Sequence, residues 1–423
     1  MIYHNFNKAL FSRILCTVLI LLLISACSNQ PKDYHPGHVV TLSVSSDGQY
    51  VISAGEKGGL LLWNIKERNY QVISTSANPL TPYFIHNTHN YLWQSNDNVV
   101  HVDNINGKEL LHFKSQKSYS NVMTSDRHYF FMTDVHWKFY RYNTETQQWK
   151  KLYNGYLSYM GEPLNLSLNS NDQFMLSSGV CDKKNDEVPV GKPRGMLNLD
   201  CVTRWNVQTG KPIRKYWGNV NKTVATFSPD NKYILAVDED SHGYIWNLAK
   251  TKSVKLWSLS YGIPTKHNKY GLNTAFDRKG LLPIPKDFKD YSGEANESMV
   301  SAKYITKNEY LRFDFYIDYA VLYQGLNPKP TQYLKLGYMP FPSTNDFSRD
   351  QSIDTSPSAH VLVTGQGVFD GINVYKFDPK TKTLYRVWTP ILHKPPQAPP
   401  ISKDVPTLPG VKFADLTKVK QVG

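Results

Sequence analysis

The clearest hydrophobic pattern in the chain lies between Gly37 and Ser74, where short apolar runs alternate with polar turns. Runs of this length, separated by Gly, Ser, Asp and Asn residues, are typical of β-strands joined by tight turns. The expected strands are Val39–Val44, Tyr50–Ala54, Leu60–Trp63 and Tyr70–Ser74. Four strands in this order predict one antiparallel sheet. Because a single sheet cannot bury both of its faces, the pattern also predicts that the unit is repeated.

Two polar marks recur along the chain. The first is a polar turn after the first strand of each unit, at Ser46-Asp47, Asn87-Thr88, Ser125-Asp126, Ser170-Asn171, Pro229-Asp230, Lys307-Asn308 and Pro357-Ser358. The second is an Asn or Asp that begins a hairpin after the third strand, at Asn64, Asn104, Asn143, Asn206, Asn247 and Asp378, with Asn327 as a looser seventh. Several of these hairpins are about forty residues apart, which is typical of propeller blades. The marks predict an all-β fold, a β-propeller of about seven four-stranded blades around a central channel.

The first unit resembles a repeat of the WD-repeat family. It begins with a Gly-His pair that contains His38, ends with a Trp-Asn pair that contains Trp63, and places Ser53 ten residues before the tryptophan. In that family a His, a Ser or Thr, an Asp and the Trp form a buried hydrogen-bond network. The resemblance therefore implies structural roles for His38, Ser53 and Trp63. Lys57 occupies the position of the Asp, so this unit lacks one member of the network.

A later unit carries the complementary part of the same pattern. It contains Asp240 and Trp246, but it lacks the His and has Ala236 in the Ser position. Trp205 lies at the matching position of another unit. We expect Trp63, Trp205 and Trp246 to be core residues and not a stacking platform for a ligand. The resemblance implies a propeller of WD-repeat type and does not extend to a subfamily.

The first 26 residues resemble a bacterial lipoprotein signal peptide. Lys8 and Arg13 give a basic start, and the apolar run of residues 14–24 is short for a transmembrane helix. Small residues then precede Cys27. The resemblance implies that Cys27 becomes the mature N-terminus and carries the acyl chains, including palmitate, and that Ser28 directs the protein to the outer membrane. Several acyl chains would anchor it stably in the membrane. The alternative is an ordinary secretory peptide with an incidental cysteine.

The same patterns give the expected domain boundaries. Residues 27–36 form a short tether, residues 37–389 the propeller, and residues 390–423 a Pro-rich tail. The repeat is interrupted at 181–201 and at 259–298, and the second interruption is either a long insertion or a degenerate eighth blade. Dense prolines favour an extended polyproline II conformation. The tail is therefore a partner-docking segment, a strap that lies on the propeller, or a loose end.

Cys181 and Cys201 flank a polar segment rich in Pro and Gly, which predicts an extended loop. Export would remove Cys16 and acylation would use Cys27, which leaves these two cysteines as a pair. In an oxidising compartment two cysteines at the base of a loop are expected to form a disulfide. Closing a loop of this length stabilises a protein by about 3 kcal/mol in the chain-entropy model.

The formal net charge is +13, with Lys and Arg spread along the chain. A surface of this kind favours anionic neighbours, such as lipopolysaccharide, acidic lipid headgroups or an acidic protein face. Nucleic acid is the competing partner, but the export signal argues against it. We therefore expect no nucleic-acid partner.

No catalytic or nucleotide-binding motif is present: the sequence lacks GxSxG, HExxH and GxxxxGK[ST] patterns. His86, His89 and His101 could approach a cation, but His86 and His89 fall on a turn, where solvated histidines are the simpler explanation. The segment Asp103–Gly107 faintly resembles a calcium loop, but it coincides with a recurring hairpin. We expect no catalytic residue, no metal site and no cofactor.

These observations predict a lipid-anchored scaffold that binds other envelope proteins at the outer membrane. The alternative is a propeller enzyme or ligand-binding protein with its site at the mouth of the channel. A third possibility is a purely structural envelope protein, whose charge-driven binding would disappear at high salt.

Overall fold

A computed structural model describes most of the chain. The described residues are 39–78, 80–134, 138–153, 165–180, 200–217, 224–237, 242–249, 253–258, 300–314, 319–327, 331–336, 352–365, 371–390 and 411–412. All of them lie in one compact unit, residues 36–423. Strands and turns account for nearly all of these residues, as the alternating sequence pattern predicts.

The strands form seven antiparallel sheets of four consecutive strands each. Blade 1 contains β1 (Val39–Val44), β2 (Tyr50–Gly55), β3 (Leu60–Asn64) and β4 (Asn69–Ser74). Blade 2 contains β5 (Tyr83–Phe84), β6 (Asn90–Gln94), β7 (Val99–Asn104) and β8 (Glu109–Lys114), and blade 3 contains β9 (Ser118–Met123), β10 (Tyr129–Asp134), β11 (Phe139–Asn143) and β12 (Gln148–Tyr153). Blade 4 contains β13 (Asn165–Leu168), β14 (Phe174–Val180), β15 (Asp200–Asn206) and β16 (Pro212–Trp217).

The remaining three blades follow the same order. Blade 5 contains β17 (Val224–Phe227), β18 (Tyr233–Val237), β19 (His242–Asn247) and β20 (Ser253–Ser258). Blade 6 contains β21 (Val300–Tyr304), β22 (Glu309–Asp314), β23 (Tyr319–Gln324) and β24 (Gln332–Lys335), and blade 7 contains β25 (Ile353–Ser356), β26 (Val361–Gly365), β27 (Ile372–Asp378) and β28 (Thr383–Trp388). A fifth strand, β29 (Val411–Lys412), pairs in parallel with β28.

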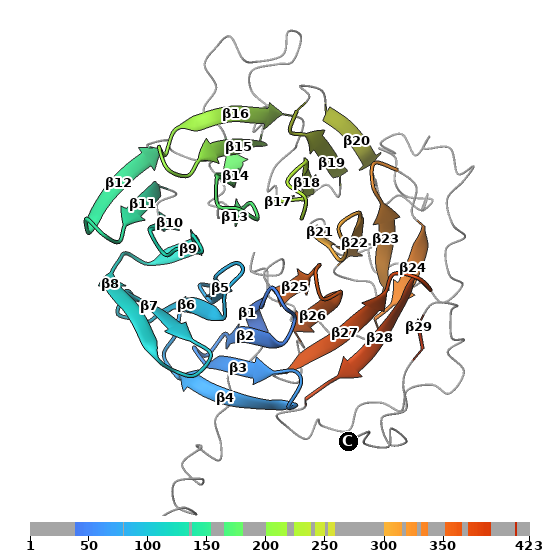
Figure 1. The fold of residues 1–423 in the computed structure, drawn as a ribbon, viewed down its shortest axis with the longest axis horizontal. Helices are drawn as coiled ribbons and strands as arrows, with labels where there is room; N and C mark the ends of the chain where they lie inside the picture. Colours follow the sequence, from blue (N-terminus) through green and yellow to red (C-terminus); the bar gives the residue numbers. More distant parts are fainter. Residues whose placement is uncertain are drawn as a thin grey trace, which may run out of the picture. The chain divides into compact units, whose positions relative to one another are not determined.

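The blades are arranged as a closed ring, with the first strand of each blade at the centre and the fourth at the rim (Figure 1). The predicted seven-bladed β-propeller is therefore confirmed. Blades 5 and 6 pack directly on each other through Val237, Ala302 and Tyr304, which leaves no room for another blade between them. Residues 259–298, for which an eighth blade was the alternative, lie outside the described residues.

The antiparallel order sorts the connections onto two faces of the ring. Turns between the first and second strands, such as Ser45–Gly48, and between the third and fourth strands lie on one face, which we call the turn face. Connections between the second and third strands, and those between blades, lie on the opposite face, which we call the connecting face. The chain leaves β14 and β20 for its two long interruptions on the connecting face, and β1 begins there.

The hydrophobic core lies between the blades. Each blade presents the apolar residues of its strands to the next blade, so that a single sheet buries both faces between two neighbours. Blades 1 and 2 share Ile52, Leu62 and Tyr91, and blades 6 and 7 share Leu311, Leu362 and Tyr375. This packing explains why the unit is repeated, since a single sheet cannot bury both of its faces alone.

The ring closes where blade 7 meets blade 1. Gly48 has a φ of +68°, and a Cβ atom at this position would lie 2.6 Å from Cβ of Ala359 and 2.9 Å from Cγ2 of Val361. The indoles of Trp63 and Trp388 also meet edge to face across this junction, with their centroids 6.0 Å apart. The glycine thus permits both the turn conformation and the close approach of the last blade.

Both recurring marks of the sequence fall where they were expected. The seven polar turns join the first and second strands of the seven blades, and the seven hairpins join the third and fourth strands. One boundary differs, because Cys201 lies within β15, so the strand begins before the second cysteine. In the expected tail, Val411–Lys412 pair with β28.

Candidate functional site

A cavity lies in the central channel of the propeller. All seven innermost strands line a cavity of about 430 Å³. Its wall is mostly made of small polar and apolar side chains, among them Thr41, Ser43, Asn121 and Thr226. Such a wall offers hydrogen-bond partners in many directions and does not select one orientation of a bound molecule.

Two charged side chains from neighbouring blades face this channel, Lys303 on β21 and Asp354 on β25. Burial raises the pKa of the Asp354 carboxyl, although the positive charge of Lys303 and hydrogen bonds from nearby groups act in the opposite direction. Its Oδ2 accepts a hydrogen bond from the backbone N–H of Val44 at 2.9 Å. Asp354 therefore joins blade 7 to blade 1 from inside the channel.

A second polar group lies near the turn face. Burial raises the pKa of the Tyr83 phenol, and the negative charges of Asp172 and Asp354 raise it further. Burial lowers the pKa of His86, which the charge of Asp172 partly offsets. Nε2 of His86 and Oδ1 of Asp172 are both buried without a hydrogen-bond partner in the described part of the chain. His86 and Asn121, whose Oδ1 is also buried without a partner among the described residues, line the channel, whereas Asp172 does not.

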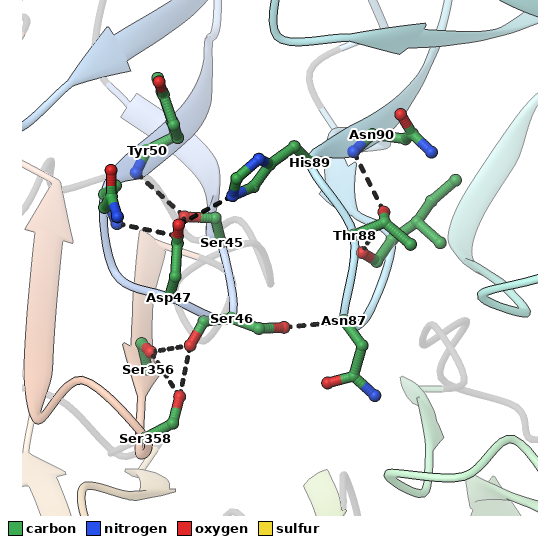
Figure 2. A network of polar contacts seen from close by, with 12 residues as sticks. Ser45, Ser46, Asp47, Tyr50, Asn87, Thr88, His89, Asn90, Ser356 and Ser358 are labelled. Atoms are coloured by element: carbon green, nitrogen blue, oxygen red, sulfur yellow. Dashed lines mark hydrogen bonds and ion pairs between the residues drawn. The ribbon is translucent and has the colours of Figure 1, made fainter.

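The turns around the channel are linked to one another on the turn face (Figure 2). The carbonyl oxygen of Ser46 accepts hydrogen bonds from the hydroxyl groups of Ser356, at 2.5 Å, and Ser358, both on blade 7. The hydroxyl of Ser46 in turn accepts a bond from the backbone N–H of Asn87 on blade 2, at 3.0 Å. Asn87 Nδ2 donates to the carbonyl of Ser170 on blade 4, at 3.1 Å. We call these linked turns the polar collar.

The collar continues through blades 3, 4 and 5. Asp172 accepts hydrogen bonds from the backbone and hydroxyl of Ser125 at 2.7 and 2.5 Å. Oδ1 of Asn231 accepts a hydrogen bond from the backbone N–H of Ser170 at 3.0 Å. Nδ2 of Asn231 donates a hydrogen bond to the hydroxyl of Ser170 at 2.5 Å. Asp172 and Asn231 both have positive φ, which Asp and Asn tolerate better than most residues. The polar turn residues that mark the sequence therefore serve to join the blades.

A carboxylate–imidazole contact joins blades 1 and 2 beside the collar. Oδ2 of Asp47 lies 2.8 Å from Nε2 of His89. The hydroxyl of Ser45 and the backbone N–H of Gln49 donate to the other carboxylate oxygen at 2.6 and 3.1 Å. Burial opposes ionisation of Asp47, but these hydrogen bonds and His89 outweigh it, and the pKa of Asp47 is lowered.

The structure places Trp63, Trp205 and Trp246 in the core and adds one hydrogen bond. The indole N–H of Trp63 donates to Ser53 Oγ at 2.8 Å, as the WD-type pattern implies. Trp205 donates to Ser177 Oγ at the same distance, a pair hidden in the sequence by the long interruption between the two residues. Trp246 is also buried in the core. His38 and Asp240 lie outside the described residues, so their implied roles stay predictions.

The histidines considered as metal ligands do not come together. His89 pairs with Asp47, whereas His101 pairs with Glu109 Oε2 at 2.9 Å and stacks on Trp93. No group of three or more potential metal-binding side chains occurs among the described residues. The faint calcium loop is a hairpin in which Asn104 Oδ1 accepts backbone hydrogen bonds at 3.0 and 3.1 Å.

Other predicted site residues fall partly or wholly outside the described residues. Cys27 and Cys181 are not described, and Cys201 is described only as a backbone position opposite Gly179 on β14. Lipidation and the disulfide therefore stay predictions. The part of the chain that the structure describes contains no helix with the length and hydrophobicity to span a membrane.

Comparison with known protein families agrees with this architecture. Residues 29–64 match the family model for the WD domain, G-beta repeat. The match covers blade 1 through the end of β3, the unit with the Gly-His and Trp-Asn pairs. A search of curated proteins found no match. Propellers of this type generally serve as scaffolds for protein interactions. With its seven blades and its matching first repeat, the chain is a WD-repeat-like β-propeller.

Proposed function

We propose that this protein is a lipid-anchored scaffold that binds envelope proteins at the bacterial outer membrane. The anchor is Cys27, which follows a lipoprotein-like signal, and the scaffold is the propeller. The observation that carries the scaffold role is topological. Both long interruptions, after β14 and after β20, leave the ring on the connecting face. Long loops on one face of a rigid scaffold are typical binding elements.

The acidic and histidine side chains support the same proposal, because the pairs named next join strands and blades. His89 is paired with Asp47, and Glu109 with His101 and His112. A nucleophile, its base and an orienting group, held in mutual hydrogen-bond reach, would instead be expected in an active site. The described residues of the channel do not show that arrangement.

A crosslinked pull-down of the full-length protein from intact envelopes tests the proposal. We expect a defined set of protein partners that is lost when Cys27→Ala prevents anchoring. Replacement of residues 182–199 by a short Gly-Asn turn should leave the propeller folded but remove partners that contact this segment. A Gly-Ser insertion after Asn106, on the turn face, is the matched control and should retain them. A clean preparation without protein partners would contradict the scaffold role.

One observation favours a second candidate, a small ligand in the channel. Nε2 of His86, a residue that lines the channel, is buried without a hydrogen-bond partner among the described residues, and Asp172 is close enough to act on it electrostatically. Native mass spectrometry of the protein purified from its own envelopes would reveal such a ligand as added mass. The added mass should disappear in His86→Gln. If the wild-type mass equals that of the chain and its acyl groups, this candidate is excluded.

A further inference from the structure

Two arginines lie opposite each other on the face of blade 4 that packs against blade 5. Arg204 on β15 is the register partner of Arg214 on β16. Tyr216 is two residues further along β16, so its side chain lies on the same face of the sheet as Arg214, and it belongs to the core that blades 4 and 5 share. Like charges directly opposite each other destabilise a sheet. The fold alone therefore does not account for this pair.

A comparison with blade 3 shows what Arg204 lacks. Arg141 lies two residues before the hairpin Asn of blade 3, as Arg204 does in blade 4. Nη1 of Arg141 donates hydrogen bonds to the backbone carbonyls of Val207, at 3.1 Å, and Gln208, both in the hairpin of the next blade. Nε of Arg204, by contrast, is buried and has no hydrogen-bond partner in the part of the chain that the structure describes. The neighbouring blade thus supplies acceptors to Arg141 and none to this atom of Arg204.

The phenol of Tyr216 is a second buried polar group of this kind. Tyr216 is 3% exposed, and its hydroxyl has no hydrogen-bond partner among the residues with described positions. Burial raises the pKa of the phenol, while the positive charges of Arg204 and Arg214 act in the opposite direction. The phenol is therefore protonated at neutral pH, and both cations lie close enough to act on it. Because buried polar groups are nearly always hydrogen-bonded, two such donors beside two cations indicate a missing acceptor.

Aromatic rings hold both guanidinium groups in place without neutralising them. The guanidinium of Arg204 lies 5.0 Å from the ring centroid of Phe174, and that of Arg214 lies 5.4 Å from the ring centroid of Tyr216. Neither arginine forms an ion pair with a carboxylate of the described residues. The simplest alternative is that both arginines only face water. That alternative does not explain Nε of Arg204 or the Tyr216 hydroxyl, because solvent reaches neither atom.

We propose that Arg204, Arg214 and Tyr216 bind a phosphate group at the junction of blades 4 and 5. Guanidinium groups bind phosphate through parallel hydrogen bonds, and two of them match the charge of a phosphate dianion. The phenol O–H supplies a further donor. Because both arginines are half-buried, a solvated anion can reach them, and rotation within the Arg204 side chain can turn Nε toward it. The phosphate is either the free anion or part of a small phosphate ester.

Isothermal titration calorimetry of the full-length protein in a neutral detergent tests this site. The probes are inorganic phosphate and glycerol 3-phosphate, titrated at constant ionic strength, with acetate as a carboxylate for comparison. We expect at least one phosphate probe to bind as a single molecule per chain and to bind more tightly than acetate. The probe with the higher affinity shows whether the site takes the free anion or an ester.

Three single variants locate the binding. Arg204→Gln and Tyr216→Phe each remove one donor to a charged acceptor, so the affinity for phosphate should fall about tenfold or more. Arg141→Gln is the matched control, because it removes an arginine from the same position of blade 3, and it should bind phosphate as the wild type does. Without phosphate, Tyr216→Phe should keep or raise the melting temperature, since the hydroxyl has no partner to lose.

Three outcomes would overturn the proposal. The first is that neither phosphate probe binds more tightly than acetate. The second is that Arg204→Gln and Arg141→Gln bind phosphate with equal affinity. The third is a lower melting temperature of phosphate-free Tyr216→Phe, because the hydroxyl would then already have a partner within the protein. None of these measurements involves the membrane anchor or a protein partner, so the result is independent of the proposed scaffold role.

Discussion

Trp63 donates its indole N–H to the hydroxyl of Ser53 at 2.8 Å, across two neighbouring strands in the fully buried part of blade 1. Ser53 is 1% exposed and Trp63 is completely buried. A donor in this position has no water to bond if its acceptor is removed. The pair therefore fixes the orientation of the largest core side chain of the blade.

We expect Ser53→Ala to reduce the free energy of unfolding by about 1–3 kcal/mol, because the indole N–H is left buried without a partner. Urea denaturation followed by fluorescence would measure this change. Ser76→Ala is a matched control, since Ser76 is exposed, and it should have almost no effect. Equal stability of the two variants would show that the indole N–H finds another partner.

The junction between the first and last blades gives a second prediction. Gly48→Ala should lower the melting temperature, because the added methyl group meets Ala359 and Val361 and the backbone has positive φ. Gly107→Ala separates these effects, since Gly107 has a φ of +76° with nothing within 4 Å of the added atom. The left-handed conformation alone costs about 1–2 kcal/mol for a non-glycine residue. A larger loss for Gly48→Ala than for Gly107→Ala, measured by calorimetry, would report the contact across the junction.

The sequence predicted the fold well because a propeller repeats local signals. The polar turns and the Asn or Asp hairpins depend on a few adjacent residues, as Asn143 shows by accepting two backbone bonds in its own turn. Contacts between blades depend on residues far apart in the chain and leave no such local signal. The Asp47–His89 pair and the Trp205–Ser177 bond could not be read in advance, since their partners are 42 and 28 residues apart.

The candidate site was less predictable for the same reason. His86 was recognised as a turn residue, but its buried Nε2 and its proximity to Asp172 follow from the meeting of blades 2 and 4.

The lowered pKa of Asp47, due mainly to the hydrogen bonds from Ser45 and Gln49 and then to His89, makes stability depend on acidic pH. The pKa of Asp47 is lowered in the folded state, so its ionised form stabilises the fold. This contribution is complete above the ordinary Asp pKa of about 4 and is lost as the pH falls through the lower folded value. We expect Asp47→Asn to reduce stability at neutral pH and to weaken the loss of stability between about pH 4 and more acidic conditions.

Thermal unfolding measured across this acidic range checks the prediction. Glu67→Gln removes one carboxylate from an exposed turn of the same blade and is the matched control. It should follow the pH profile of the wild type. Parallel profiles for Asp47→Asn and the wild type would contradict a role for the Asp47 charge in holding blades 1 and 2.

The predicted disulfide between Cys181 and Cys201 has a direct test. We expect non-reducing peptide mapping to find the two cysteines in one linked peptide. Reduction should lower the stability by about 3 kcal/mol if the chain-entropy model holds for a loop of this length. The double variant Cys181→Ser/Cys201→Ser should be insensitive to the reductant. Two free thiols in protein purified from the oxidising compartment would show that the prediction is wrong.

Blades 6 and 7 are joined by an ion pair between Glu309 and Lys382. The Glu309 side chain is 6% exposed and that of Lys382 is 37% exposed, and the other carboxylate oxygen of Glu309 accepts the hydroxyl of Thr306 at 3.1 Å. We expect Lys382→Met to lower the free energy of unfolding by about 2–4 kcal/mol, because it leaves a buried carboxylate without its cation. Adding Glu309→Gln to this variant should restore part of the loss, since the buried charge is then removed. Urea denaturation of both single variants and the double variant completes the thermodynamic cycle. If the double variant is less stable than Lys382→Met, the cost comes from lost packing of the lysine stem and not from the unpaired charge.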